Sequence, residues 1–201
     1  MRILLFFAGL VCASLAEAAG LDQLRAFWAT THTAQGAFAQ SVITKSGRKP
    51  QNSTGSFVFA RPGKLRWQYD KPIRLLLVAD GERLWTYDAD LNQVTVGKLN
   101  EALGATPAAL LTGEALDRHF TLSEAGAAEG LEIVDAIPKA ADSPFARVRI
   151  GLANNLPRLM EVEDNFGQVT TLLFTEFRAN PPLSKEAFRF VPPKGADIVG
   201  Q

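Results

Sequence analysis

The histidines, the clustered carboxylates and the single cysteine are the residues of this sequence best suited to hold a metal ion or to catalyse a reaction. His32 and His119 are the only histidines and lie in no cluster with ligand spacing, and Cys12 stands alone. Zinc sites need several such ligands close together, and no nucleophile elbow, His-Glu-x-x-His pair or phosphate loop is present. The acidic residues at 161, 163 and 164 are typical of a solvated strand edge. The sequence therefore predicts neither an enzyme nor a cofactor or metal.

Arg61 is the charged residue with the clearest potential for a specific role. It stands at the end of an aromatic segment, directly before Pro62. One interpretation is a solvated strand end. The other is a guanidinium that donates several hydrogen bonds to backbone carbonyls of a neighbouring element, where a lysine would be a poor substitute. A two-residue turn at Pro62-Gly63 sets Arg61 on the face opposite Trp67, and a one-residue slip reverses that face.

Residues 57–87 combine the pattern of β-hairpins with more large apolar side chains than one small sheet face needs. A two-residue turn at Asp80-Gly81 pairs Leu76 with Trp85, and both faces then carry apolar residues. Core filling explains any one of these residues. The whole set indicates a curled sheet with helices across its mouth, around an interior space. The set comprises Trp28, Phe57, Phe59, Leu65, Trp67, Leu76, Trp85, Leu110 and Leu111.

The elements that position these residues follow from hydrophobic periodicity. Residues 20–31 have helical spacing of apolar side chains, and after them the period changes to two. Short strands joined by tight turns, such as Asn154-Asn155, favour an antiparallel meander that forms a large curled sheet or barrel. The predicted strands are 36–46, 54–61, 64–70, 74–79, 82–88, 92–98, 119–125, 131–137, 145–152, 158–164, 168–178 and 188–191.

A short helix is predicted between the strands, with Thr106 as N-cap, Pro107 in the first turn and Gly113 at the end. So short a helix is unstable alone, and its apolar surface must lie on other apolar surface. It is either a connector that caps the core or a movable lid over a cavity.

The first residues have the pattern of a cleaved export signal. Arg2 precedes an apolar run, and residues 16–18 form a small-x-small cleavage site. We therefore expect a signal peptide at 1–18 and a single domain at 19–201. Cys12 lacks the context of a lipoprotein anchor. With 21 basic and 21 acidic residues the formal net charge is zero, which argues against nucleic acid as a partner.

Short motifs in a fixed order along nearly the whole predicted domain resemble the LolA family of periplasmic lipoprotein carriers. No single motif is decisive, but their order and spacing are specific. They are Gly36-Ala37-Phe38-Ala39-Gln40, Gly55-Ser56-Phe57, Arg61-Pro62-Gly63, Trp67-Gln68-Tyr69, Asp80-Gly81, Leu84-Trp85-Thr86-Tyr87, the segment 106–111 and the ending 188–197.

The resemblance implies a mainly β (α+β) fold, an incomplete antiparallel β-barrel of about 11 strands with a lid of short α-helices over a hydrophobic cavity. It implies a monomeric periplasmic carrier of acylated lipoproteins. Such a carrier takes lipoproteins from an inner-membrane ABC-type release complex to an outer-membrane receptor. A lipoprotein-sensing regulatory module on the same fold, an anchored outer-membrane acceptor and a secreted lipid hydrolase are the alternatives.

The resemblance also assigns roles to residues. Arg61 matches the family's arginine that hydrogen-bonds the closed lid, and Ala108 replaces a bulky aromatic residue found in some relatives. Positions of the acyl-chain cavity and lid are matched by Leu24, Trp28, Leu65, Trp67 and Leu111.

Overall fold

The computed structural model describes residues 19–46, 49–99, 111 and 119–200. The elements whose bounds lie within these residues are the α-helix α1 (Gly20–Thr30), a short 3-10 helix, η1 (Lys185–Phe188), and twelve strands. The strands are β1 (Thr33–Ile43), β2 (Gln51–Ala60), β3 (Lys64–Lys71), β4 (Leu75–Asp80), β5 (Arg83–Asp88), β6 (Gln93–Lys98), β7 (Phe120–Ala128), β8 (Leu131–Pro138), β9 (Phe145–Ala153), β10 (Leu156–Asp164), β11 (Val169–Ala179) and β12 (Asp197–Val199).

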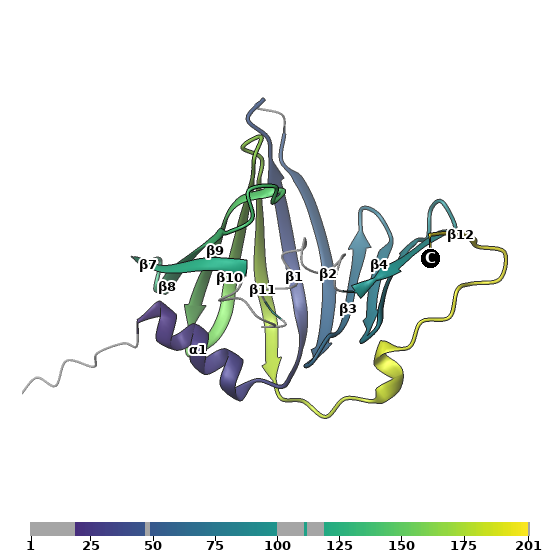
Figure 1. Ribbon diagram of the computed structural model, residues 1–201, viewed down its shortest axis with the longest axis horizontal. Helices are drawn as coiled ribbons and strands as arrows, with labels where there is room; N and C mark the ends of the chain where they lie inside the picture. The colour runs from purple at the N-terminus through teal and green to yellow at the C-terminus, as the bar shows by residue number, and fades with distance from the viewer. Residues whose placement is uncertain (1–18, 47–48, 100–110, 112–118, 201) are drawn as a thin grey trace, which may run out of the picture.

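All twelve strands belong to one curved sheet that does not close (Figure 1). Its order is β12-β6-β5-β4-β3-β2-β1-β11-β10-β9-β8-β7, so β12 and β7 form the two ends. Every pairing is antiparallel except that of β12 with β6. Two meanders, β1 to β6 and β7 to β11, are joined where β1 pairs with β11. The predicted incomplete antiparallel barrel is therefore confirmed, with twelve strands.

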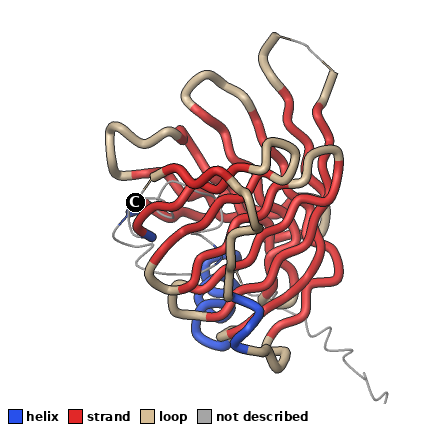
Figure 2. The backbone as a smooth tube through the Cα atoms, turned by 90° about the vertical axis from the view of Figure 1, so that its right-hand side faces the viewer, coloured by secondary structure: helices blue, strands red, loops and turns tan. Residues whose placement is uncertain are grey.

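The helix α1 lies across one end of the curved sheet, below β9 and β10 (Figure 1), and several of the hairpin loops gather at the other end (Figure 2). Leu24 and Phe27 are fully buried on its inner side, as expected of an amphipathic helix. The backbone N–H of Leu21 in its first turn donates to Oε1 of Glu124 on β7 at 2.9 Å. A carboxylate there satisfies a donor that lacks a partner within the helix.

Most predicted strands are confirmed, with ends displaced by a few residues, but the last one is wrong. Residues 188–191 end η1 and then run outside any ladder, whereas the chain forms β12 at Asp197–Val199. Two prolines follow at 192 and 193, and proline supplies no N–H to a ladder. β12 has only three residues, all exposed, so no alternation marks it in the sequence.

The predicted turns at Asp80-Gly81 and at Pro62-Gly63 have different loop residues in the structure. The β4–β5 loop is Gly81-Glu82, which pairs Leu76 with Tyr87 rather than with Trp85. Asp80 causes this, because its Oδ1 accepts the backbone N–H groups of residues 82 and 83 at 2.9 and 2.8 Å. The Asn154-Asn155 turn is confirmed, with φ of 55° and 59° at the two asparagines.

The β2–β3 loop contains three residues, 61–63, and not two. Ala60 pairs with Lys64, and Gly63 adopts a φ of 65°, a conformation that favours glycine. By this one-residue slip Phe57 pairs with Trp67 on the concave face of the sheet, and Arg61 follows on that same side.

The core lies between α1 and the concave face and is rich in aromatic rings. Phe38 stacks on Trp67 with centroids 4.3 Å apart, and Phe27 meets the edge of Phe59 at 6.3 Å. Gly55, opposite Tyr69 on β3, leaves the space into which the Phe38 ring fits. The aromatic cluster fills the end of the curved sheet nearest α1.

Candidate functional site

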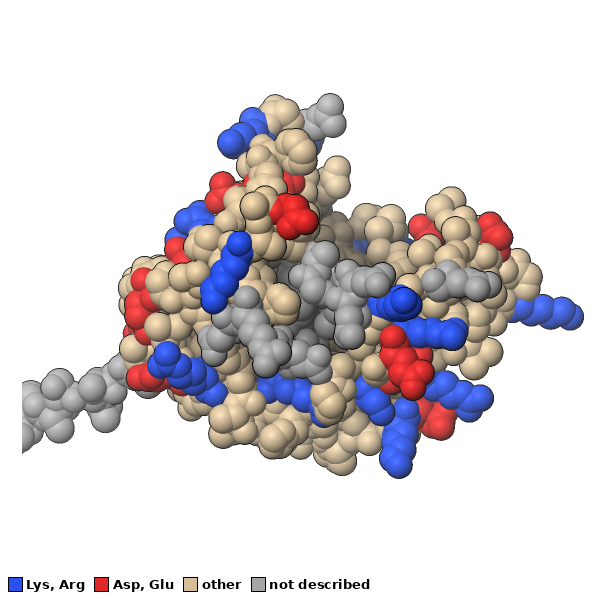
Figure 3. All heavy atoms as spheres, viewed as in Figure 1, with Lys and Arg blue, Asp and Glu red and all other residues tan. Residues whose placement is uncertain are grey.

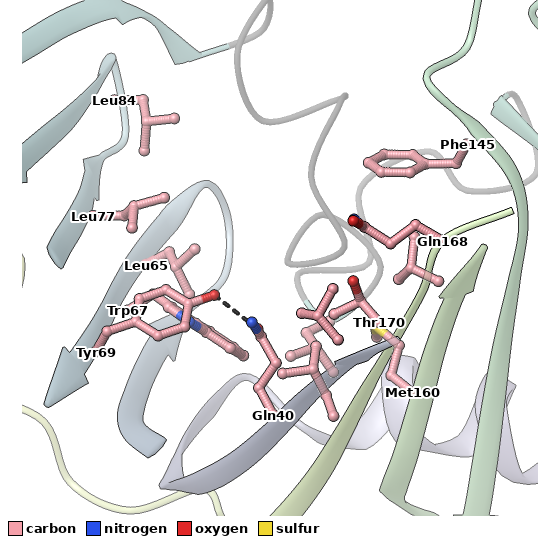
Figure 4. Close-up of a pocket in the computed structure, with 14 residues that line it drawn as sticks. Gln40, Leu65, Trp67, Tyr69, Leu77, Leu84, Phe145, Met160, Gln168 and Thr170 are labelled. Carbon is pink, nitrogen blue, oxygen red and sulfur yellow. Dashed lines mark hydrogen bonds between the residues drawn. The ribbon is translucent and has the colours of Figure 1, made fainter. Parts of the chain in front are cut away.

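The concave face is not filled along its whole length. Beyond the aromatic cluster lies a partly open pocket with a volume of about 400 Å³, into which side chains from β3–β5 and from β9–β11 point (Figure 4). This volume is within the range of small-molecule sites. Its lining is Gln40, Val42, Leu65, Trp67, Tyr69, Leu77, Leu84, Leu111, Phe145, Met160, Val162, Gln168, Thr170 and Leu172.

Three of the predicted cavity residues line this pocket. Leu65 and Trp67 alternate along β3 and are 1% and 5% exposed, and Leu111 is 1% exposed. Other predicted residues lie in the core that supports the pocket. These are Leu24, Phe57 and Phe59, which are fully buried, and Trp28, which packs against the same cluster. Leu110 lies outside the described residues.

The structure places Leu76 and Trp85 on the convex face, so their assignment to the cavity is wrong. Leu77 and Leu84 point into the pocket in their place. The indole N–H of Trp85 donates to Oδ2 of Asp80 at 2.9 Å, and its ring lies 5.6 Å from that of Phe190. The sequence misled here because the C-terminal segment covers this part of the convex face, so β4 and β5 are apolar on both sides.

The wall formed by β10 and β11 was not predicted from the sequence. Met160 and Val162 on β10 and Thr170 and Leu172 on β11 alternate inward and line the pocket. Their period of two was visible, but only the pairing of β1 with β11 shows that they face β3 across the concavity.

Arg61 holds three parts of the chain together at the closed end of the pocket. Its Nη1 donates to the carbonyl oxygens of Trp28 at 2.8 Å and Thr31 at 2.6 Å, with Phe27 farther away at 3.4 Å. Its Nη2 donates to the carbonyl oxygen of Leu111 at 2.8 Å. Carbonyls at the end of a helix lack partners within it and carry partial negative charge, which suits a guanidinium.

The surroundings of Arg61 are otherwise apolar. Its guanidinium carbon lies 4.9 Å from the ring centre of Phe27 and 5.4 Å from that of Phe59, within the range of cation–π attraction. Burial lowers the pKa of Arg61 from its usual value to about 10, so the side chain is charged at neutral pH. Its buried Nε has no hydrogen-bond partner among the described residues. Burying this charge has an unfavourable desolvation energy, and the hydrogen bond to Leu111 depends on the charged side chain.

Other functional chemistry is sparse in the part of the chain that the structure describes. It contains no group of three or more His, Cys, Asp or Glu able to hold a metal ion. None of its helices has the length and apolar character needed to cross a membrane. Figure 3 shows basic and acidic side chains interspersed over the face seen there.

The fold and the site define an open-barrel protein with an apolar binding pocket on its concave face. Residues 29–191 match the family model described as outer membrane lipoprotein carrier protein LolA, and the chain belongs to the LolA family.

Curated relatives agree with this assignment, and a solved structure shares the fold. The outer-membrane lipoprotein carrier protein of Dechloromonas aromatica is 49% identical over 188 residues, covering 93% of this chain and 90% of its own. The protein of the same name from Nitrosospira multiformis is 43% identical over 201 residues, covering 99% and 96%. A crystal structure of a LolA superfamily protein from Nitrosomonas europaea shares the fold, with a TM-score of 0.53 at 10% identity, covering 87% and 99%.

Proposed function

We propose that this protein is a periplasmic, non-enzymatic carrier that binds the acyl chains of lipoproteins and delivers them toward the outer membrane. The observation that carries the proposal is the apolar pocket, walled by Leu65, Trp67 and Met160, in a chain whose curated relatives are named for that activity. An export signal at residues 1–18 and a single domain at 19–201 fit a protein that works between the two membranes.

The physical need for such a pocket follows from the cargo. Each methylene transferred out of water contributes about 0.8 kcal/mol, so an acyl chain partitions strongly into membranes unless it is covered. A lining of leucine, valine, methionine and tryptophan side chains on rigid strands provides that cover.

Release requires that binding is not too strong. We propose that Arg61 acts as a latch that favours the closed, empty form by holding Leu111 against the end of α1. Cargo then competes with the latch, and transfer proceeds from weaker to tighter partners. The donor is an inner-membrane ABC-type release complex and the acceptor an outer-membrane receptor, with the carrier acting as a monomer.

The proposal is tested by recovering the protein from the periplasm of a Gram-negative host and identifying bound molecules by mass spectrometry. We expect triacylated lipoproteins with the wild type. Leu77→Lys, which puts a charge into the pocket, should abolish their recovery, whereas Leu76→Lys on the convex face of the same strand should not. Recovery of free lipid alone or of a turnover product, or equal loss in both folded variants, would contradict the carrier.

A further inference from the structure

Four of the pocket's lining residues are polar, and they are not scattered. Gln40 on β1, Tyr69 on β3, Gln168 directly before β11 and Thr170 on β11 surround the same space as the leucines (Figure 4). A pocket that only shielded hydrocarbon would have no use for them, because a polar group facing hydrocarbon loses its hydrogen bonds to water.

The strand register places these residues at successive inward positions, from Tyr69 at the level of Phe38 to Gln40, Thr170 and then Gln168. On β1 the inward series runs from Phe38, in the aromatic cluster, to Gln40 and then toward the hairpin loop. Gln40 pairs with Leu172 on β11, and Thr170 lies one inward position farther along. The polar row therefore lies between the apolar floor near α1 and the open end of the strands.

Hydrogen bonding within the row leaves donors directed at the pocket. The hydroxyl of Tyr69 donates to Oε1 of Gln40 at 2.9 Å. This bond occupies the carbonyl of the Gln40 amide and turns its NH₂ group away from Tyr69. No hydrogen bond within the described residues engages that NH₂ group, the amide of Gln168 or the hydroxyl of Thr170.

Tyr69 is a stable orienting group for this amide. Burial raises the pKa of the Tyr69 hydroxyl, and a hydrogen bond from Trp67 opposes that effect only in part, so the hydroxyl stays protonated as a donor at neutral pH. The aromatic ring of Tyr69 meets Phe38 edge-on at 5.2 Å, which fixes its position. The Gln40 amide is thus preorganised by packing as well as by its hydrogen bond.

We propose that this polar row, defined as Gln40, Tyr69, Gln168 and Thr170, binds the carbonyl oxygens that terminate the acyl chains. This inference rests on the proposed carrier function and adds the part of the lipid that is recognised. Ester and amide carbonyls are strong acceptors that lose water when the chains enter the pocket, and each leaves an unfavourable buried acceptor unless a donor replaces that water. Amide N–H and hydroxyl donors on the open side of the apolar floor meet that need.

The row also sets the depth at which a chain is held. Hydrocarbon alone has no preferred position along an apolar wall, because the hydrophobic effect is non-directional. A carbonyl bound at Gln40 leaves the chain below it against Trp67, Leu65 and Leu111, and directs the head group toward the open end. The proposal therefore predicts that the protein distinguishes acylated from merely alkylated ligands.

The test compares a short-chain diacylglycerol with the dialkyl glycerol ether of equal chain length, which lacks both carbonyls. Dissociation constants are measured by displacement of a fluorescent fatty acid from the purified protein. We expect the wild type to bind the ester about fivefold more tightly than the ether, as for one neutral hydrogen bond. Equal affinity of the wild type for the two lipids would overturn the proposal while leaving the carrier function intact, and binding of neither lipid would overturn both.

The variant for this test is the double substitution Gln40→Leu with Tyr69→Phe. Removing both partners leaves no buried hydroxyl unsatisfied, so the fold is retained. We expect the double variant to bind the ester and the ether with about equal affinity, while its affinity for the ether is unchanged or higher. Gln68→Leu, on the convex side of β3 where its amide bonds only Asp70, is the matched control and should keep the preference. A folded double variant that retains the wild-type ratio, or loses ester and ether binding equally, contradicts the proposal.

Discussion

Replacing Arg61 by leucine tests whether closure at Leu111 limits the affinity for acyl chains. The substitution removes the hydrogen bond from Nη2 to the carbonyl oxygen of Leu111 and leaves an apolar side chain beside the rings of Phe27 and Phe59. We expect a folded protein that binds acyl chains more tightly and releases them more slowly, because the empty closed form loses its latch.

The size of the effect follows from two opposed contributions. A hydrogen bond from a charged donor contributes about 1.5–3 kcal/mol. Against it stands desolvation. Burial lowers the Arg61 pKa to about 10, a shift that corresponds to about 3 kcal/mol before it is reduced by solvent screening of a half-buried side chain. We therefore take the lower end for the latch, about 1.4 kcal/mol, or a tenfold change in the closed-to-open ratio.

The apparent affinity changes by the same factor as the fraction of protein in the open form, which binds acyl chains. If the open form is the minor one, the apparent dissociation constant of a fluorescent fatty acid should fall about tenfold in Arg61→Leu. The effect should not vary between pH 6 and pH 9, because a pKa of about 10 keeps the guanidinium charged there. Only as the pH rises above that pKa does deprotonation relieve the cost of burial, so the stability contributed by Arg61 increases there with pH.

Equilibrium titration with the fluorescent fatty acid gives the affinity, and dilution into acceptor vesicles gives the release rate. Arg66→Leu is the matched control, because Arg66 lies on the opposite face of β3 from Leu65 and Trp67. Affinity and release at wild-type values in Arg61→Leu, with circular dichroism unchanged, would remove Arg61 from the mechanism. Weaker binding with an intact fold would assign it to ligand contact instead.

Three further experiments test the placement of particular residues. Bromine quenches tryptophan fluorescence on contact. A brominated fatty acid should therefore quench the steady-state fluorescence of the wild type and of the convex-face variant Trp85→Phe, and should quench that of Trp67→Phe only weakly. Gly55→Ala adds a methyl group against an aromatic ring and a backbone carbonyl and should lower thermal stability by about 2 kcal/mol, whereas Gly97→Ala, in open space, should be nearly neutral. Burial acts to raise the pKa of the Asp80 carboxyl, but its hydrogen bonds and a nearby arginine lower it overall. The stabilising contribution of this carboxylate is therefore present above pH about 4 and is lost on acidification. Asp80→Asn should accordingly flatten the acid unfolding profile below that pH.

Local patterns in the sequence specify most of the strands and one wall of the pocket. Leu65, Trp67 and Tyr69 alternate with Arg66 and Gln68, and such a period of two places the first set on one face whatever the rest of the chain does. The Asn154-Asn155 turn is likewise local, since asparagine accepts positive φ and the turn needs it twice. These features depend on neighbours a few residues apart.

Which face becomes the pocket depends on contacts between distant segments. Leu76 and Leu77 are equally apolar in sequence, and Trp85 is as large as Trp67, yet the C-terminal segment covers Trp85 with Phe190 on the convex side. No pattern within β4 or β5 records that cover, because it comes from residues about a hundred positions away.

The sequence by itself determined the family, the helix at 20–30 and the alternation that makes one strand face apolar, because these depend on residue types and short spacings. The tertiary structure alone decided the side on which Arg61 lies, through a three-residue loop, and brought its guanidinium to the carbonyls of Trp28, Thr31 and Leu111. It alone also gathered Gln40 and Tyr69 into one polar row with the start of β11. A one-residue change of register reverses a side chain's face, and register is set by the packing of the whole sheet.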